Sequence, residues 1–261
     1  MGKKQRFIIV SDVHGFYNEM MDALNNVNFN PESDFLVSLG DNTDRGPNPQ
    51  GVIDYLESLP NKKLVMGNHE GLVMSCIETG FPYNHDWHNG TAQTILDLAP
   101  NAKNFYEACA VSYDKFKPFV DKMVDYFETK NYIFVHGWIP LICKDNLPSH
   151  YIRNRRFEFN SDWRNAHFSE WEQARWLNGM DMARKGFVER GKTIVCGHWH
   201  CSYGHMIDDM AKNGPFDCID EFGDTAIWEP YYSNGIIAID RCTAHTGEVN
   251  VLVLEDEFLE E

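Results

Sequence analysis

The stretch Gly40-Asp41-Asn42-Thr43-Asp44-Arg45-Gly46 comes directly after the apolar run Phe35 to Leu39. A short apolar run bounded by glycine is typical of a buried strand. This strand ends in two carboxylates, an amide and a guanidinium, which packing alone does not need. The stretch therefore predicts a functional site at a strand end of an α/β protein.

Four further apolar runs also end in residues that can bind a metal. They are Phe7 to Val10 before Asp12 and His14, Leu64 to Met66 before Gly67-Asn68-His69-Glu70, Tyr132 to Val135 before His136, and Thr193 to Cys196 before Gly197-His198-Trp199-His200. The carboxyl ends of neighbouring strands in α/β sheets converge on one edge. The repeated pattern suggests one sheet that delivers its strand ends to a single polynuclear metal site.

The candidate metal ligands are carboxylates, an amide and imidazoles: Asp12, His14, Asp41, Asn68, His136, His198 and His200. This donor set suits Mn, Fe or Zn, with Mg as a further candidate, better than a metal that prefers thiolate. Seven ligands are too many for one tetrahedral ion and suit two divalent ions that share a carboxylate. Asp41 is the natural bridge. Two such ions can clamp the attacking and leaving oxygens of a displacement at phosphorus.

Each motif by itself also has an ordinary explanation. Gly40-Asp41 could mark a turn, Asn68 could cap a helix, and His198 and His200 could be loop histidines. The ordered set, with each motif placed after a strand, favours the metal site.

The charge and the start of the chain exclude several functions. Among 261 residues, 39 are acidic and 23 are basic, which gives a formal charge of −16. Nonspecific nucleic-acid binding needs a basic surface and is disfavoured. The basic start is followed by only four apolar residues, too few for a signal-peptide core or a membrane span. The seven cysteines are scattered without a CxxC pair. We therefore expect reduced thiols in a cytoplasmic protein without a membrane or nucleic-acid partner.

The order of patterns along the chain predicts an α/β fold. Strands are expected over 6–10, 35–39, 63–66, 132–135 and 193–196, and helices over 16–26, over 49–59 and from residue 69 onward. This alternation predicts a parallel sheet with right-handed crossovers. Residues 80–130 read as mostly helical, and a second helical insertion lies at about 140–190, clearest over 163–187. Residues 201–230 look irregular and acidic. Two final strands, 235–240 and 249–254, are joined by a turn at 246–248. No Pro-, Ser- or Gly-rich linker divides the chain, so we predict a single domain over 1–261.

The ordered motifs Asp-x-His, Gly-Asp-x-x-Asp-Arg-Gly, Gly-Asn-His-Glu, His-Gly and Gly-His-x-His resemble those of the calcineurin-like metallophosphoesterases. Asp44-Arg45-Gly46 and Glu70 narrow the resemblance to the phosphoprotein phosphatase branch. Trp87-His88-Asn89-Gly90-Thr91 is similar to a segment of its bacterial and phage-type members. The resemblance implies a four-layer α/β/β/α sandwich with helical insertions and a dimetal site at its edge.

The resemblance also implies a role for each matching residue. Asp12, His14 and Asp41 would hold the first metal, which His200 would complete, while Asp41, Asn68, His136 and His198 would hold the second. His69 would be the general acid that protonates the leaving alkoxide, oriented by Asp44. Arg45 would bind the phosphoryl oxygens in the bidentate manner that guanidinium allows, together with Asn68.

Several residues remain open between a functional and a structural role. A second phosphate-binding arginine is expected among Arg164, Arg175 and Arg184. Arg175, beside Trp176, is our choice, with a salt bridge as the alternative for any of them. Trp138 replaces the small residue usual in the branch and could line the pocket or pack in the core. His85 and His88 could rim the site or be solvated loop histidines.

Together these features predict a dimetal-dependent phosphomonoester hydrolase acting on a phosphorylated protein, peptide or small phosphoester. The specific prediction is a protein serine/threonine phosphatase in which a metal-bound hydroxide attacks phosphorus directly. One alternative is a hydrolase of dinucleoside polyphosphates such as diadenosine tetraphosphate. A second is a non-catalytic scaffold, which the retained ligands and His69 disfavour. The acidic run 208–229 could exclude polyanions or favour basic phosphopeptides, and a solvated loop is its default explanation. The oligomeric state is left open.

Overall fold

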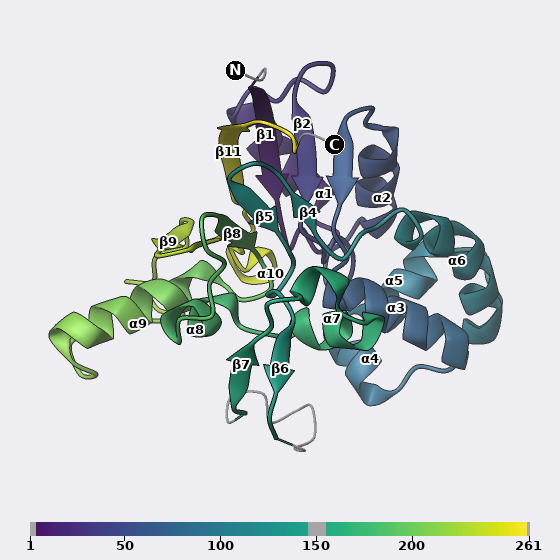
Figure 1. The fold of residues 1–261 in the computed structure, drawn as a ribbon. Coiled ribbons are helices and arrows are strands. Elements are labelled where there is room, and N and C mark those ends of the chain that lie inside the picture. Colours follow the sequence, from purple (N-terminus) through teal and green to yellow (C-terminus); the bar gives the residue numbers. More distant parts are fainter. Residues whose placement is uncertain (1–3, 146–154, 260–261) are drawn as a thin grey trace.

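The strands that position the site form two sheets, which a computed structural model describes over residues 4–145 and 155–259 (Figure 1). The first sheet has the order β11–β1–β2–β3: Val251–Asp256, Gln5–Val10, Phe35–Ser38 and Lys62–Leu64. The second has the order β4–β5–β8–β10–β9: Phe127–Glu128, Tyr132–Phe134, Thr193–Cys196, Ile236–Ala238 and Tyr231–Ser233. The inner strands of each sheet run parallel, and β11, β4 and β9 are antiparallel to their neighbours.

The five ligand-bearing strand ends therefore belong to two sheets, and the single sheet suggested by the pattern is wrong. β1, β2 and β3 supply the first three ends, and β5 and β8 supply the other two. The final two predicted strands are also divided, because β10 lies in the second sheet while β11 pairs with β1 in the first.

Alternate side chains of each strand face opposite layers, as the period of a strand requires. In β1, Phe7 and Ile9 lie between the two sheets, whereas Ile8 and Val10 face the helices. β5, β8 and β10 repeat this alternation on the other side. Each such buried side chain stabilises the fold by about 1.5–3 kcal/mol. The result is the expected four-layer α/β/β/α order, with helices outside both sheets.

Most helices of the first half share one apolar cluster with the outer face of the first sheet, and the shortest of them packs on the helix that follows it. The helices of this half are α1 Tyr17–Asn26, α2 Pro49–Ser58, α3 Asn68–Thr79, α4 Asn84–Asn89, α5 Thr91–Leu98 and α6 Phe105–Val120. The predicted helical insertion is thus present, but α6 ends at Val120. Phe127, which we had expected in a helix, pairs with Phe134 in β4. Asn48 and Asn104 begin α2 and α6 with side-chain caps to Gly51 and Glu107.

The second half departs further from expectation. Its helices are η2 Trp163–Asn165, α7 Phe168–Ala174, α8 Gly179–Arg184, α9 Cys201–Asn213 and α10 Thr243–Thr246. The insertion at 140–190 also holds the hairpin β6 Leu141–Cys143 and β7 Phe157–Phe159, which we did not predict. The prediction that 201–230 is irregular is wrong for its first part, because these residues form helix α9. This helix projects from the body of the molecule (Figure 1). The part of the insertion at 146–154 lies outside the described residues.

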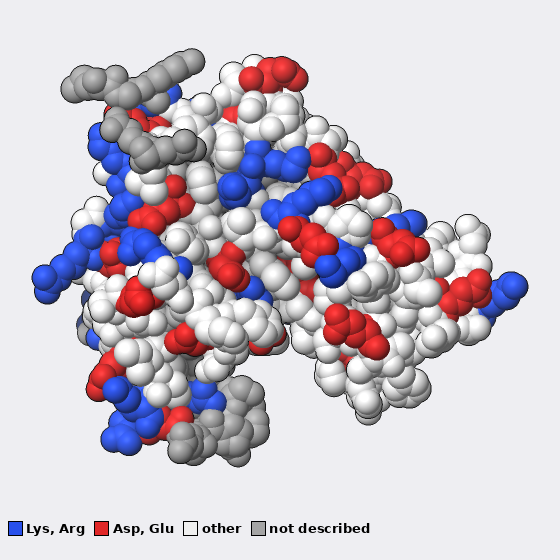
Figure 2. Space-filling model, turned by 45° about the vertical axis from the view of Figure 1, so that its right-hand side comes forward, with Lys and Arg blue, Asp and Glu red and all other residues white. Residues whose placement is uncertain are grey.

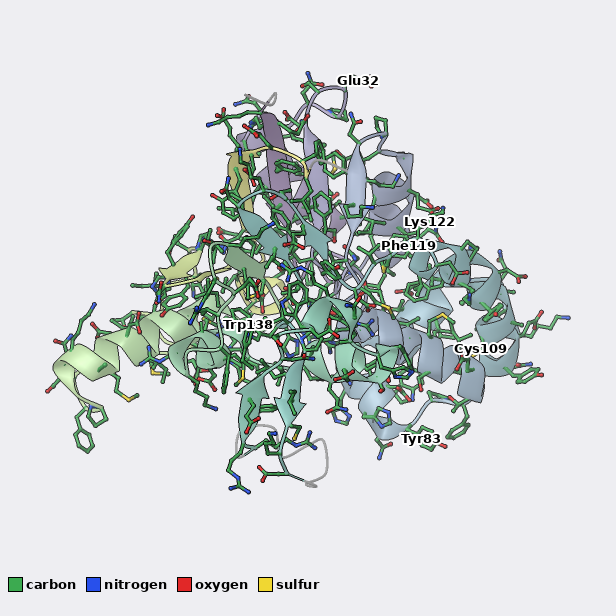
Figure 3. The ribbon with its side chains drawn as sticks, viewed as in Figure 1. Glu32, Tyr83, Cys109, Phe119, Lys122 and Trp138 are labelled. Carbon is green, nitrogen blue, oxygen red and sulfur yellow. The ribbon has the colours of Figure 1, made fainter. Side chains whose placement is uncertain are left out.

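Trp138 packs in the core of the second half rather than lining a pocket. Its side chain is buried between the second sheet and its helices (Figure 3), and its indole N–H donates to the backbone oxygen of Phe187 at 2.9 Å.

The prediction of a single domain stays a prediction. Within the described ranges, every helix is too short or too polar to cross a bilayer.

Candidate active site

Strained backbone marks the loops that follow the ligand-bearing strands. Among the described residues, eight non-glycine residues have positive φ, and six of them belong to the predicted site: Asp12, His14, Asp41, Asp44, Arg45 and His198. L-residues rarely adopt this conformation, and each instance costs of order 1–3 kcal/mol unless the surroundings hold it. The conformation of these loops therefore orients the site side chains, at a cost in backbone strain.

Hydrogen bonds between loops hold the first-sheet part of the site in place. The backbone N–H of Asp12 donates to Gly40 and that of His14 donates to Asp41, at 3.1 and 2.9 Å. The buried carboxylate of Glu70 accepts from the N–H groups of Gly67, Asp41 and Asn42 at 2.8–3.0 Å. Glu70 thus joins the loops after β2 and β3 and caps α3.

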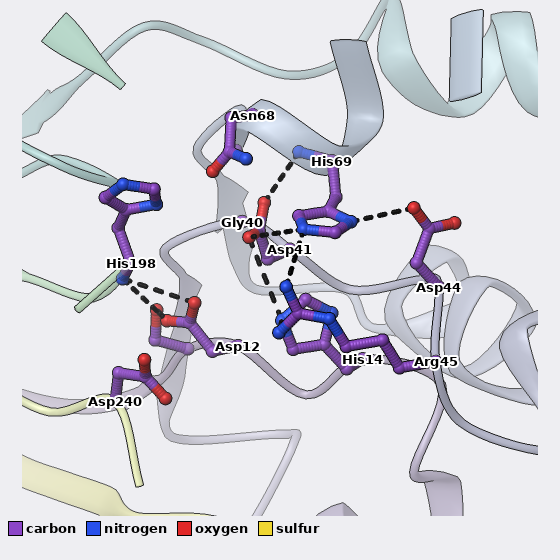
Figure 4. Close-up of polar contacts among 12 residues, drawn as sticks. Asp12, His14, Gly40, Asp41, Asp44, Arg45, Asn68, His69, His198 and Asp240 are labelled. Atoms are coloured by element: carbon purple, nitrogen blue, oxygen red, sulfur yellow. Dashed lines mark hydrogen bonds and ion pairs between the residues drawn. The ribbon is translucent and has the colours of Figure 1, made fainter. Parts of the chain in front are cut away.

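Two groups of ligand atoms share Asp41. The first comprises His14, Asp41 and His69, and the second comprises Asp41, His136 and His198. Within each group all ligand atoms lie within 4.8 Å of one another. The Asn68 side-chain oxygen lies 2.7 Å from His136 Nε2, and the backbone N–H of His198 donates to the Asp12 carboxylate at 3.0 Å (Figure 4). The structure therefore brings six of the seven predicted ligands together.

The imidazoles are oriented as metal ligands usually are. Nδ1 of His14 lies 3.0 Å from the Thr43 backbone oxygen, and Nδ1 of His136 lies 2.8 Å from that of Leu39. A ring that donates from Nδ1 to a carbonyl keeps the lone pair of Nε2 free to bind an ion. Both Nε2 atoms face Asp41, at 3.9 and 3.4 Å.

The charges at the centre also fit a cation. Burial raises the pKa of Asp12 to about 6. Burial and the nearby Asp12 carboxylate together raise the pKa of Asp240 well above its usual value. Burial and the neighbouring His136 lower the pKa of His198 to about 3, so this ring is neutral at physiological pH. Buried carboxylates beside a neutral imidazole form a donor set that divalent ions satisfy.

A second constellation lies beside the ligands and involves the predicted catalytic residues. His69 Nδ1 is 2.7 Å from Asp44 Oδ2, which also accepts from the Thr91 hydroxyl at 2.6 Å. The two terminal nitrogens of Arg45 lie 2.9 Å from His14 Nε2 and 3.0 Å from His69 Nε2 (Figure 4). Arg45 is the exposed member of this otherwise buried set, so its guanidinium is open to a substrate.

The segment around Gly90 supports this constellation from behind. A Cβ at Gly90 would lie 2.3 Å from the backbone nitrogen of Arg45, so only glycine allows this approach. Thr94 accepts from the backbone N–H of Asp44 at 3.0 Å. Gly90, together with Thr91 and Thr94 of α5, therefore positions Asp44 and Arg45, a role that the sequence alone did not reveal.

The structure does not bring His200 into either ligand group. His200 Nδ1 lies 2.8 Å from the Ser202 hydroxyl and Nε2 lies 3.3 Å from Glu221. His200 is the residue directly before α9, and the ring stays with that helix and the loop that follows it. We therefore leave it out of the proposed ligand set.

The three candidate arginines are each engaged by carboxylates. Arg175 is only 7% exposed and donates to Asp125 at 2.5 Å. Arg164 binds Glu128 and Glu189, and Arg184 contacts Asp208. A phosphate-binding role for Arg175 stays a prediction. His85 and His88 are exposed and contact their own helix, at Asp86 and Asn84.

Two residues near the centre were not predicted. Asp240 follows β10 and lies beside Asp12 (Figure 4), where its carboxylate accepts from the N–H of Cys242 at 2.6 Å. Its signal was the same as for the ligands, a polar residue directly after an apolar strand. Trp176 is exposed, and its ring lies 5.8 Å from that of His198. No local pattern marks Trp176, because it follows the end of α7 and meets His198 only in the fold.

Comparisons with known proteins define the class. The model of the calcineurin-like phosphoesterase family matches residues 5–202, and the chain belongs to this family. The fold and the site thus define the class as that of the calcineurin-like phosphoesterases.

Particular relatives are similar over shorter stretches. The chain is 40% identical over 72 residues to serine/threonine-protein phosphatase 2 of Escherichia coli (strain K12), covering 28% of this chain and 33% of that protein. It is 43% identical over 63 residues to the symmetrical bis(5'-nucleosyl)-tetraphosphatase of Salmonella paratyphi B (strain ATCC BAA-1250 / SPB7), covering 24% and 22%. The matches thus span a third or less of these relatives.

A solved structure is similar over almost the whole chain. The crystal structure of a proposed diadenosine tetraphosphatase aligns with a TM-score of 0.52 at 17% identity and covers 98% of this chain and 95% of the other. At this identity the likeness concerns the fold.

Proposed function

We propose that this chain is a protein serine/threonine phosphatase that uses two divalent ions. The observation that carries the proposal is the buried Asp44–His69 pair, with Arg45 in front of it, beside two ligand groups that share Asp41. Asp12, His14 and Asp41 would hold one ion, and Asp41, Asn68, His136 and His198 the other. When bound, the ions supply positive charge for the phosphoryl group and an activated water.

His69 is suited to hand a proton to the leaving group. Burial alone would lower the pKa of His69, but Asp41 and Asp44 outweigh burial and raise it. A raised pKa favours the protonated ring, which can give its proton to a departing alkoxide. Asp44 fixes the ring through Nδ1, which leaves Nε2 as the atom that transfers the proton.

Arg45 is suited to bind the phosphoryl oxygens. Its guanidinium spans the gap between His14 and His69 and presents two N–H groups at one side of the site. Paired donors of this kind match the oxygens of a phosphate. Charge that develops on phosphorus would then be stabilised by this guanidinium.

His69→Ala tests the proposed general acid, and Asn68→Ala tests the proposed amide ligand. Each variant should hydrolyse p-nitrophenyl phosphate at least about 100-fold more slowly, the lower end of the loss expected for a general acid. Thermal unfolding should confirm that both variants fold. If either variant keeps wild-type kcat, the assigned roles are wrong.

A second candidate is a dinucleoside polyphosphate hydrolase, favoured by the 43% identity to a symmetrical bis(5'-nucleosyl)-tetraphosphatase. The same catalytic residues would act on a phosphoanhydride. Comparing kcat/KM for a phosphoserine peptide and for diadenosine tetraphosphate separates the two functions. A higher value for the nucleotide would replace our proposal with the second.

A further inference from the structure

An aromatic surface, formed by the rings of His200, Phe222, Trp228 and His245, is held next to the site. The ring centroid of Phe222 lies 4.6 Å from that of His200 and 5.8 Å from that of Trp228, and Trp228 lies 5.3 Å from His245. Phe222 is 52% exposed, which is unusual for a ring in a cluster of four. The surface is formed by residues that the proposed chemistry does not use.

The loop that carries the aromatic surface is fixed in position. The Ser202 hydroxyl donates to the backbone oxygen of Glu221 at 2.7 Å, and the Asn250 side chain donates to that of Trp228 at 2.8 Å. Asp220 and Thr225 close the loop on itself. Because these bonds already order the rings, a ligand that binds them loses little further entropy.

The aromatic surface lies within reach of Asp240, which lies beside the proposed ligand Asp12. Cys242 donates its N–H to Asp240, which lies beside Asp12, and His245 is three residues further along the chain. Three residues span at most about 10 Å. An extended peptide advances about 3.3 Å per residue, so a neighbour two or three positions from a phosphoserine can contact the surface.

The charges around the aromatic surface select the kind of ligand. Glu221 and Asp224 lie on the loop itself, and Glu229 follows Trp228 directly. The nearby cation, Arg241, is already occupied by Glu229 and Glu248. Acidic groups around aromatic faces attract a Lys or Arg side chain, which binds the ring faces directly. A dinucleoside polyphosphate would meet repulsion from the same carboxylates.

We propose that this aromatic surface binds a basic side chain next to the phosphorylated residue, so that the preferred substrates are phosphopeptides with flanking Lys or Arg. The inference rests on the proposed function, since it names the substrates of the same site. It assigns Phe222 and Trp228 to substrate selection rather than to chemistry.

The test compares three phosphoserine peptides of equal length, flanked by Arg, by Ala or by Glu. The dissociation constant is measured with non-hydrolysable phosphonate analogues, and kcat/KM with the phosphopeptides themselves. The basic peptide should bind at least about fivefold more tightly than the acidic one, within the range of a cation–π contact. Phe222→Ala should remove most of this preference. Phe216→Ala is the matched control on the same acidic segment, where the ring is 97% exposed, and should retain the preference.

Failure of this inference can be told apart from failure of the proposed function. Equal binding of the three peptides, or equal effects of Phe222→Ala and Phe216→Ala, would overturn the inference. Hydrolysis of p-nitrophenyl phosphate by the same protein would still support the proposed phosphatase activity. A preference in binding without any hydrolysis would uphold the surface and refute the phosphatase. If Phe222→Ala instead weakens binding of a diadenosine tetraphosphate analogue, the surface binds a nucleobase and our assignment is wrong.

Discussion

The two sheets supply ligand segments of different kinds. The loops after β1, β2 and β3 are bonded to one another through backbone groups and through Glu70, and they carry Asp41, His69 and Arg45. The segments after β5 and β8 supply His136 and His198, and they lie near the large aromatic side chains of Trp138 and Trp176. The face shown in Figure 2 mixes Lys and Arg with Asp and Glu, so no single charge dominates that side. We therefore propose that the first sheet supplies the residues that act on the substrate, whereas the second sheet supplies two metal ligands, His136 and His198.

Asp41→Asn against His198→Ala tests this division most strongly. Asp41 belongs to both ligand groups, so the Asp41→Asn variant should lose both ions. Its kcat should fall at least about 100-fold, which is more than the loss usual for a residue that only hydrogen-bonds a metal ligand. His198→Ala should lose one ion. Elemental analysis of the purified variants measures the number bound. Equal metal content in the two variants would show that Asp41 is not shared.

Gly90→Ala tests whether the first-sheet constellation depends on its support. The new Cβ would meet the Arg45 backbone and the φ of +83° disfavours alanine, so Arg45 should shift. A displacement of about 1 Å can cost on the order of 100-fold in kcat/KM. Gly71→Ala in α3, where nothing lies within 4 Å, is the control and should gain about 0.5–1 kcal/mol in helix stability. Similar kinetics for both variants would contradict the proposed role of Gly90.

Much of this first-sheet chemistry could be predicted, whereas the second half could not. Asp12, Asp41 and Asn68 each follow an apolar strand, and the local pattern suffices to find them. The division into two sheets was hidden because both faces of β1 are apolar, with Phe7 and Ile8 equally buried. α9 was missed because the Gly- and acid-rich residues that follow Asn213 dominate the composition of 201–230, although the apolar residues of α9 recur at helical spacing. Trp176 reaches the site through a tertiary contact that no spacing encodes, whereas Asp240 follows an apolar strand and could have been found by the same pattern.

Arg175→Ala separates structure from phosphate binding in the second half. The observed partner of Arg175 is Asp125, so the variant should lose about 1–2 kcal/mol of unfolding free energy, less than a fully buried pair because Asp125 is partly exposed. Arg45→Ala should instead lower kcat/KM with little change in melting temperature. A large kinetic loss in a stable Arg175→Ala variant would restore its predicted role in binding phosphate.

Asp256→Asn tests the bond between the two sheets and should have the smallest effect. Asp256, at the end of β11, accepts from Thr129 and from Asn131, just before β5. Burial alone would raise the pKa of Asp256. The hydrogen bonds from these donors outweigh burial and lower the pKa below its usual value of 3.8. A depressed pKa means that the stabilisation is present above about pH 4 and is lost as the pH falls through the lowered value.

Urea unfolding from pH 7 to pH 2.5 measures this difference. The Asp256→Asn variant should be about 1 kcal/mol less stable at pH 7, and the gap should close in acid. A gap that is constant with pH would show that the carboxylate charge does not matter.

The pairing of β11 with β1 also bears on the order of events during synthesis. β1 is translated before β11, its antiparallel partner, which follows every proposed ligand in the chain, including His198. Until residues 251–256 emerge from the ribosome, the first sheet is incomplete and the edge of β1 that later pairs with β11 stays open. Metal loading is therefore expected after translation has passed β11, and a nascent chain stalled before that point should be prone to aggregation through the open edge of β1.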